Sequence, residues 1–244
     1  MRALPLPAHL HMALDEVLLQ RLGSGRRGPT LRFWEWQERA LVLGANQVVV
    51  NEVDLRAADE LGFRLTRRMS GGGTMIVEPG RTITYSLYAP QSLVAGMTFV
   101  ESFAFLDRWA VQCLRDLGVP AGYRPINDIV SPRGKIGGAA QARRREAVLH
   151  HTTIAFEIDA DLVPCLIRIG RERVSPRGVR SAEKAVSPLS WFLDLPIGAV
   201  VEELITCFGD HNQATVGRLT DDELTAAREL AARKYETAAW IDRL

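Results

Sequence analysis

Two short stretches that combine glycine with basic residues constrain this chain most strongly. Residues 67–74 read Arg-Arg-Met-Ser-Gly-Gly-Gly-Thr, and residues 134–141 read Gly-Lys-Ile-Gly-Gly-Ala-Ala-Gln. Glycine loses more conformational freedom on folding than any other residue, so three in succession disfavour the interior of a helix or strand. Residues 63–67 and 82–88 alternate in the manner of half-buried strands. We therefore predict that the glycine triplet is a loop between two strands.

The rest of the chain alternates between helical and extended patterns. Apolar residues at helical spacing, ended by glycine or proline, predict helices at 11–22, 55–61, 100–117, 161–169, 198–207 and 221–235. Alternating or β-branched runs predict strands at 31–36, 40–43, 63–67, 82–88, 128–130, 134–136 and 148–158. Repeats and low-complexity linkers are absent from the sequence. We therefore expect one mixed α+β domain over residues 1–244.

Composition excludes several classes of protein. The chain has 244 residues, of which 47% are hydrophobic, enough to bury a full core. An apolar run of about 20 residues, which a membrane helix needs, does not occur. The N-terminus lacks the pattern of a secretion signal, so we expect a cytoplasmic protein that does not bind membranes.

Charge and cysteine usage add two expectations. The net charge of +1 conceals a basic stretch between Arg124 and Arg145. Such a stretch is expected near a polyanionic ligand or on a docking face for an acidic partner, and a solvated basic surface is the plainer alternative. The three cysteines are Cys113, Cys165 and Cys207. Their wide separation argues against disulfides and metal sites, so we expect core thiols.

The two glycine-rich stretches match neither a P-loop nor a dinucleotide fingerprint, yet they suit an anion. Glycine amides can point together at a phosphate, an arginine can grip it with two donors, and a lysine acts as a point charge. Activation of a carboxylic acid by ATP needs donors for the α-phosphate, a cation for developing charge, and a group for magnesium or adenine. Arg68 with the amides of residues 71–74, then Lys135, and Asn127 with Asp128 are candidates. A tight hairpin, a surface lysine and an ordinary turn pair are the corresponding structural alternatives.

Two further features predict core structure rather than binding. His150 and His151 are adjacent on a predicted strand, so their side chains point to opposite faces and do not form a metal pair. The tryptophans are not interleaved with basic residues as in proteins that bind single-stranded nucleic acid. We expect no nucleic-acid partner and a core location for Trp34, Trp36, Trp191 and Trp240.

Taken together in order, these motifs resemble the catalytic domain of lipoate-protein ligases, within the wider group of biotin and lipoate protein ligases and octanoyltransferases. The matching segments are residues 12–16, 33–36, 43–47, 67–74, 127–128, 135–141, 150–153, 178–181, 234–235 and Trp240. The resemblance implies an α+β fold of mixed, largely antiparallel sheets flanked by helices. It also implies a two-step reaction. Lipoate and ATP form lipoyl-adenylate, and the acyl group then passes to a lysine of a lipoyl carrier domain, such as an acyltransferase E2 component or a glycine-cleavage H-type protein.

The resemblance also implies which residues form the site. Lys135 would be the catalytic residue and contact both the lipoyl carbonyl and the phosphate, and Asp128 would hold Mg²⁺. An apolar tunnel would receive the lipoyl tail. The full set of residues implied to bind substrate or ATP is Arg68, Ser70, Gly71, Gly72, Gly73, Thr74, Met75, Ile76, Asn127, Asp128, Lys135, Gly138, Ala140 and His151.

The chain departs from the family pattern at several points. Val77 stands where these ligases usually carry histidine, Arg81 where they often carry asparagine, and Thr152 where glycine is usual. The sequence stops at Leu244, before the small C-terminal domain that many of these ligases carry. We expect a separate small subunit to supply that part.

Two other activities stay open from the sequence. An octanoyltransferase of the same fold would move its acyl group through a cysteine thioester. Residues 124–151 contain no cysteine, and Cys165 is the nearest candidate beyond them, so the ligase is favoured. The third alternative is a non-catalytic subunit that binds a lipoyl domain or nucleic acid through the basic stretch. The intact glycine triplet and Lys135 argue against it.

Overall fold

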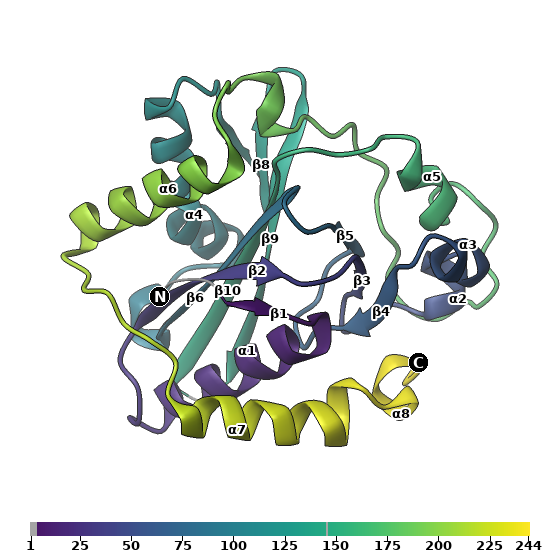
Figure 1. The fold of residues 1–244 in the computed structure, drawn as a ribbon, viewed down its shortest axis with the longest axis horizontal. Coiled ribbons are helices and arrows are strands. Elements are labelled where there is room, and N and C mark those ends of the chain that lie inside the picture. Colours follow the sequence, from purple (N-terminus) through teal and green to yellow (C-terminus); the bar gives the residue numbers. More distant parts are fainter. Residues whose placement is uncertain (1–3, 145) are drawn as a thin grey trace.

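A computed structural model describes residues 4–144 and 146–244. Its larger sheet has seven strands in the order β1-β2-β6-β10-β9-β8-β7, and the smaller has three in the order β4-β3-β5 (Figure 1). The strands of the larger sheet are β1 Pro5–Leu6, β2 Thr30–Trp36, β6 Thr82–Pro90, β7 Gly122–Arg124, β8 Asp128–Ser131, β9 Gly134–Arg144 and β10 Ala147–Ala155. Those of the smaller sheet are β3 Ala40–Leu43, β4 Arg64–Arg67 and β5 Met75–Val77.

The sheets are mixed but largely antiparallel, as expected. In the larger sheet only the short β1–β2 pair is parallel among the described pairs. In the smaller sheet β3 runs parallel to β4 and antiparallel to β5. The glycine triplet lies between β4 and β5, which confirms that it is a loop between strands.

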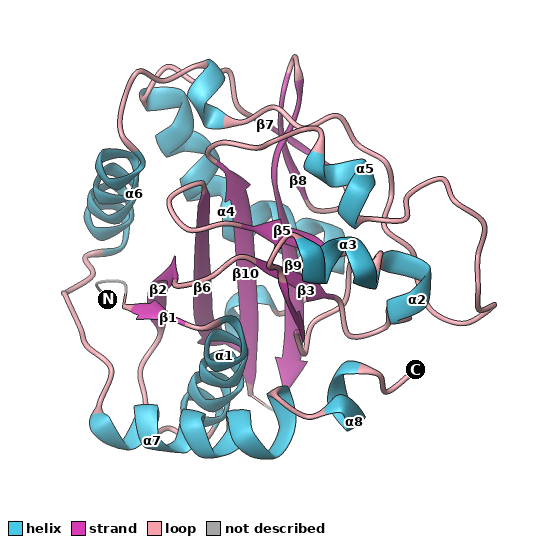
Figure 2. Ribbon diagram, turned by 45° about the vertical axis from the view of Figure 1, so that its right-hand side comes forward, coloured by secondary structure: helices cyan, strands magenta, loops and turns pink. Residues whose placement is uncertain are grey.

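Helices cover both faces of the larger sheet (Figures 1 and 2). On one face α1 packs against β6 and β10, with α7 outside it, and on the other α4 packs against β10 and is backed by α6. The helices are α1 Ala8–Gly23, α2 Val49–Glu52, α3 Leu55–Glu60, α4 Phe99–Asp116, α5 Leu162–Leu166, α6 Ile197–Asn212, α7 Asp221–Leu230 and α8 Ala238–Ile241. Residues Ala231–Tyr235 continue α7 as a π-helix.

Alternation along the strands assigns side chains to these two faces. On β2, Leu31 and Phe33 join the core under α4, whereas Trp34 and Trp36 join the core under α1. Because both faces are covered, both sets of side chains are buried. The prediction that Trp34 and Trp36 belong to the core is confirmed.

Most predicted elements occur within a few residues of their expected positions. Capping explains two of the sharpest starts, because Thr98 begins α4 and Thr220 begins α7, each with a reciprocal bond to a glutamate three residues on. The expected strand 134–136 was too short, since β9 continues to Arg144. Small residues that gave no strand signal are held there by pairing with β10.

Two expectations about the core are wrong. Cys165 is exposed on α5, whereas Cys113 is buried and Cys207 lies between these extremes. Trp191 is 48% exposed, and the Arg133 guanidinium stacks on its ring at 4.1 Å. Both residues lie in short helical turns near the surface, where an isolated apolar side chain is common.

Within the described residues, no helix has both the length and the apolar character that crossing a membrane requires.

Candidate functional site

Arg68 fixes the conformation of the glycine loop, residues 70–74, by hydrogen bonds to several of its residues. The Arg68 guanidinium donates to the carbonyl oxygens of Gly71 and Gly73 at 2.5 and 2.9 Å, and to Val42 O at 3.0 Å. Its Nε donates to Ser70 Oγ at 3.1 Å. Arg68 is 3% exposed, and burial lowers the pKa of its guanidinium to about 10. Most of its donors are therefore used inside the protein, and its predicted contact with a phosphate stays a prediction.

The backbone of the glycine loop closely approaches the segment after β3, and this explains one glycine in each, Gly72 and Gly44. Gly72 has a positive φ of 93°, and its carbonyl oxygen lies so near Gly44 that a Cβ there would be 2.1 Å away. Only glycine fits at Gly44, because no side-chain atom tolerates that distance from a backbone oxygen. The neighbouring Arg67 secures the same region by donating to Gly44 O and Gln47 O at 2.8 and 2.7 Å.

The far end of the loop is tied to a segment more than a hundred residues away in sequence. The Thr74 amide donates to Ser181 Oγ at 2.9 Å, and Thr74 Oγ1 donates to Gln47 Oε1 at 3.0 Å. Ser181 Oγ and Gln47 Nε2 both donate to the buried carboxylate of Glu52, at 2.5 and 2.6 Å. The loop is thus preorganised by hydrogen bonds at both ends.

Ser70 is hydrogen-bonded to a histidine, which is in turn hydrogen-bonded to an aspartate. His151, on β10, lies with its Nε2 2.6 Å from Ser70 Oγ and its Nδ1 2.7 Å from the Oδ2 of Asp15 on α1. The other oxygen of Asp15 accepts from Arg32, Ser86 and Tyr88 at 2.6–2.9 Å. Ser70, His151 and Asp15 are each at most 4% exposed.

Lys135 lies in a second group, near the turn between β8 and β9. Its Nζ is 2.8 Å from Asp128 Oδ1, and Lys184 binds the other oxygen of the same carboxylate. Burial lowers the pKa of Lys135 below its ordinary value, although Asp128 opposes this. Gly138 makes room for the lysine, because a Cβ there would lie 2.5 Å from Nζ. Lys135, Lys184 and Asp128 together carry one net positive charge, because two ammonium groups share one carboxylate.

One strand-like segment connects the two groups. Residues 181–187 begin at the glycine loop through Ser181 and then run beside β9. The Lys135 amide donates to Ala185 O at 2.8 Å, and the Ser187 amide donates to Lys135 O at 2.7 Å. The Arg68 charge contributes to lowering the pKa values of both Lys135 and His151. The structure therefore gathers the two sequence stretches into one electrostatic region.

The other predicted site residues take less direct positions. Ala140 pairs with His151 across β9 and β10. Asn127 donates to Ala139 O, which fixes the start of β8 rather than presenting a free amide. Met75 and Ile76 lie on β5 and face different apolar clusters, under α1 and beside α3. Their predicted contacts with a nucleotide stay predictions.

The three departures from the family pattern lie outside these contacts. Val77 is buried in the apolar cluster under α1. Arg81 pairs with Glu78 and Glu157 near the surface. Thr152 donates to Asp107 on the α4 face of the sheet, away from His151.

A cavity of about 350 Å³ adjoins the glycine loop. It is bordered by Met69 and Gly71 and by the charged side chains of Glu16, Arg144 and Lys234, with Trp240 at its edge. The Lys234 ammonium lies 4.1 Å from the Trp240 ring and 2.6 Å from Glu16 Oε2. This lining is too charged for the apolar tunnel expected from the sequence, so the tunnel stays a prediction.

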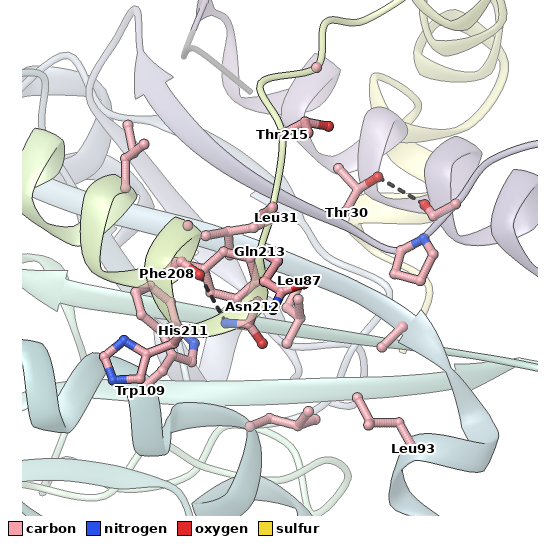
Figure 3. Close-up of a pocket in the computed structure, with 18 of the residues that line it drawn as sticks. Thr30, Leu31, Leu87, Leu93, Trp109, Phe208, His211, Asn212, Gln213 and Thr215 are labelled. Atoms are coloured by element: carbon pink, nitrogen blue, oxygen red, sulfur yellow. Dashed lines mark hydrogen bonds between the residues drawn. The ribbon is translucent and has the colours of Figure 1, made fainter.

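A larger cavity of about 1450 Å³ lies on the other side of the sheet, between α4, α6 and the segment that follows α6. Leu31 and Leu87 of the sheet line it together with Trp109 of α4 and Phe208 of α6 (Figure 3). Of the described residues that line it, none belongs to the predicted site. Volume alone therefore does not identify the site.

The donor set does not fit a metal held by the protein. In the described part of the chain, no three His, Cys, Asp or Glu side chains gather closely enough to hold an ion. Asp128, the predicted Mg²⁺ ligand, has both oxygens bound to lysines. Two ammonium groups on one carboxylate leave it poorly suited to a cation.

Sequence reasoning missed several residues that the structure brings to the site. Asp15, Gln47 and Ser181 lie in segments that carried the family resemblance, but no role was assigned to them. Charged or polar residues inside apolar patterns, such as Asp15 in its helix, were the available signal. Lys184 and Glu52 gave no comparable signal, because only the fold brings them near their partners.

Comparison with known proteins places this geometry in a family. The family described as the lipoyl protein ligase A/B catalytic domain matches residues 7–209. An octanoyltransferase, LipM of Anoxybacillus flavithermus, is 28% identical over 94% of this chain and 92% of its own length. Subunit 1 of a lipoate-protein ligase A from Thermoplasma acidophilum is also 28% identical, over 95% of this chain and 90% of its own.

Solved structures agree in fold over the whole chain. A bi-partite lipoate protein ligase from T. acidophilum, described with its E2 lipoyl domain, has a TM-score of 0.82 and 26% identity, covering 100% of this chain and 95% of its own. A lipoate-protein ligase A bound with ATP has a TM-score of 0.81 and 27% identity, covering 100% and 99%. A T. acidophilum protein with bound lipoic acid has a TM-score of 0.81 and 27% identity, covering 99% and 97%.

The relatives divide between lipoate-protein ligases and octanoyltransferases. The comparisons therefore identify the chain as an enzyme of this group of ligases and transferases. The family match covers most of the 244 residues, and the fold and motif order agree with it. The chain belongs to the lipoyl protein ligase A/B catalytic domain family.

Proposed function

We propose that this protein is the catalytic subunit of a lipoate-protein ligase. It activates lipoate with ATP, and the lipoate carboxylate attacks the α-phosphorus, so that pyrophosphate leaves and lipoyl-adenylate forms. The amine of a lysine on a lipoyl carrier domain then attacks the acyl carbonyl, and AMP leaves. Both steps build negative charge on oxygens, which fixed cations and amide dipoles stabilise.

The observation that carries this proposal is the position of the thiols. Cys113 lies on α4 and Cys207 on α6, both on the face opposite the glycine loop. Cys165 lies on α5, which packs beside α2 and α3. A cysteine-dependent transferase needs a thiol beside its acyl carbonyl, and the three cysteines, all among the described residues, lie on α4, α5 and α6 rather than on β9 or the glycine loop. An adenylate-forming ligase needs none.

The residues present suit the ligase chemistry in named roles. Lys135, freed from Asp128 by an incoming anion, would hold charge on the acyl carbonyl and the α-phosphate. The loop amides around Gly72 would line the phosphate, because the loop is already fixed by Arg68 and Ser181. Lys184 would retain the partnership with Asp128 when Lys135 turns to substrate. Magnesium would accompany the nucleotide phosphates rather than occupy a protein cage, and no step is assigned to it.

Two partners follow from the relatives. The carrier is a lipoyl domain, of the E2 type named in the T. acidophilum complex or of the glycine-cleavage H type. A small accessory polypeptide completes the enzyme, as the description of that relative as bi-partite supports. The basic residues near Lys135 and the loop suit an acidic surface on the carrier.

One assay tests the proposal. The protein is incubated with lipoate, Mg-ATP and a lipoyl domain, with and without the small subunit, and the domain is weighed by mass spectrometry. We expect a lipoyl mass gain that requires ATP. Lys135→Ala should reduce the rate by about 10²-fold to 10³-fold, the usual loss for a preorganised charge-stabilising donor. Cys165→Ser is the matched control and should leave the rate unchanged.

The octanoyltransferase alternative predicts a different result in the same assay. If octanoyl carrier protein labels the domain without ATP, and a cysteine variant abolishes this, the ligase proposal is wrong. ATP-pyrophosphate exchange that depends on lipoate and on Lys135 would exclude the transferase in turn.

A further inference from the structure

A continuous chain of buried hydrogen bonds runs from β2 to the glycine loop. Arg32 Nη2 donates to Asp15 Oδ1 at 2.9 Å, Asp15 Oδ2 meets His151 Nδ1 at 2.7 Å, and His151 Nε2 meets Ser70 Oγ at 2.6 Å. Ser70 Oγ in turn accepts from Arg68 Nε at 3.1 Å. Each of these residues is at most 4% exposed, so water does not compete for these bonds.

The protons in this chain can be placed from chemistry. Burial alone would raise the pKa of Asp15, but the bond from His151 and the charge of Arg32 hold it below its ordinary value, so Asp15 is a carboxylate. A carboxylate only accepts, so the His151 Nδ1 must carry a proton. Burial lowers the pKa of His151 against the raising effect of Asp15, so the ring is neutral and its Nε2 is an acceptor. Ser70 must therefore donate its hydroxyl proton to His151.

The direction of each bond fixes the next. With its proton committed to His151, the Ser70 oxygen presents a lone pair to Arg68 Nε. The same Arg68 guanidinium binds the carbonyl oxygens of Gly71 and Gly73. The loop conformation thus depends on the Ser70 hydroxyl, and Asp15 sets the orientation of that hydroxyl through His151.

We propose that Asp15 is a positioning residue for the glycine loop, acting through the tautomer of His151 and the hydroxyl of Ser70. The proposal rests on the proposed function for its kinetic consequences, because it takes the loop to line the nucleotide. Asp15 does not touch the substrate. It holds the histidine in the tautomer that accepts the Ser70 hydroxyl proton, which fixes the orientation of that hydroxyl beside Arg68, as a carboxylate paired to a histidine does in other sites.

Asp15→Asn reverses this order with almost no change in shape. The asparagine oxygen can still accept from Arg32, but its amide then faces His151 Nδ1 and donates to it. His151 becomes protonated at Nε2 and donates to Ser70 Oγ, so the Ser70 hydroxyl proton loses its acceptor and the hydroxyl must turn while its oxygen accepts from both His151 and Arg68. We expect a fall in kcat/KM for ATP of about 10-fold to 100-fold, the usual effect of losing a group that orients a functional histidine. The KM for the carrier domain should not change.

A double-mutant cycle separates positioning from general damage. Ser70→Ala removes the last link, so adding Asp15→Asn to it should lower kcat/KM no further than about twofold. Full additivity of the two losses would overturn the proposal. Asp107→Asn, a buried aspartate paired to His150 on the other face, is the matched control and should leave the KM for ATP unchanged.

Nuclear magnetic resonance decides the proposal without any activity. In the wild-type protein, ¹⁵N shifts of the His151 ring should show the proton on Nδ1, and Asp15→Asn should move it to Nε2. The Ala45 amide donates to Ser70 O and the Thr74 amide donates to Ser181 Oγ, and the exchange of these two amides with solvent should accelerate in Asp15→Asn and in Ser70→Ala. A wild-type ring protonated at Nε2, or loop exchange unaltered in both variants, overturns the inference. Absence of ATP-pyrophosphate exchange in the wild type with the small subunit present would instead overturn the proposed function alone.

Discussion

His150 and His151 are neighbours on β10, and each binds a buried aspartate, yet their hydrogen bonds end in different places. On the α1 face, His151 and Asp15 lead to Ser70 and the glycine loop. On the α4 face, His150 Nε2 lies 2.7 Å from Asp107, whose same oxygen accepts from Tyr85 and Thr152. That second cluster continues from His150 through Gln141 and Ser102 to Arg143, and none of these bonds reaches the glycine loop.

The difference shows that a His–Asp pair has no function of its own. Both pairs join the central sheet to one helix, although Asp107 Oδ2 is buried without a hydrogen-bond partner among the described residues. Only the α1 pair passes a bond to a loop that can contact a ligand. Alternation along one strand therefore separates a structural pair from a positioning pair at adjacent residues.

The strongest test of this comparison changes the two histidines in the same way. His151→Gln places an amide near the position of Nε2 but loses the contact to Asp15, so we expect kcat/KM for ATP to fall about 10-fold to 100-fold. His150→Gln should lower thermal stability and leave kcat/KM unchanged, because the hydrogen bonds of His150 lead to Asp107 and Gln141 and not to the glycine loop. Steady-state kinetics and thermal unfolding of both variants check this. Equal kinetic losses in the two variants would remove the distinction.

Acid stability sharpens the comparison, because buried His11 belongs to the α1 face. His11 donates to Glu35 O, accepts from Arg32, and stacks on Trp34, and burial, helped by Arg32, lowers its pKa from 6.5 to about 3. A lowered folded-state pKa means that the unfolded chain binds the proton first. Stability is thus complete above about pH 6.5 and is lost as pH falls towards about 3.

His11→Gln should reduce that slope by up to about 1.4 kcal/mol per pH unit, which corresponds to one proton. Asp15 and His151 also have lowered pKa values and contribute in the same direction, so some acid dependence remains. Denaturant unfolding at several pH values measures the slope. Wild-type and variant curves should be parallel above pH 7, and parallel curves down to pH 4 would contradict the assignment.

The smallest expected effect tests the α4 face alone. Thr152→Val keeps the side-chain shape but removes the hydroxyl that donates to Asp107 at 2.7 Å, so we expect a stability loss of about 1 kcal/mol. The kinetic constants should not change, because Thr152 points away from His151. A change in KM for ATP would show that the two faces communicate.

Local patterns in the sequence were enough for much of the fold. The periodicity of residues 100–117 predicted α4, and alternation at 82–88 predicted β6. The prediction that His150 and His151 point to opposite faces is confirmed, since it needs only the geometry of a strand. The extension of β9 through its small residues was missed, because cross-strand pairing rather than propensity holds it.

The sequence by itself determined the loop, the strand alternation and the family, because each is written in local spacing or in the order of motifs. Only the tertiary structure decided which polar groups meet. Asp15 and His151 are 136 residues apart, Glu52 and Ser181 are 129 apart, and Asp128 and Lys184 are 56 apart. The physical reason is that a buried polar atom must find its partner wherever the packed elements bring one, and sequence spacing does not record that distance.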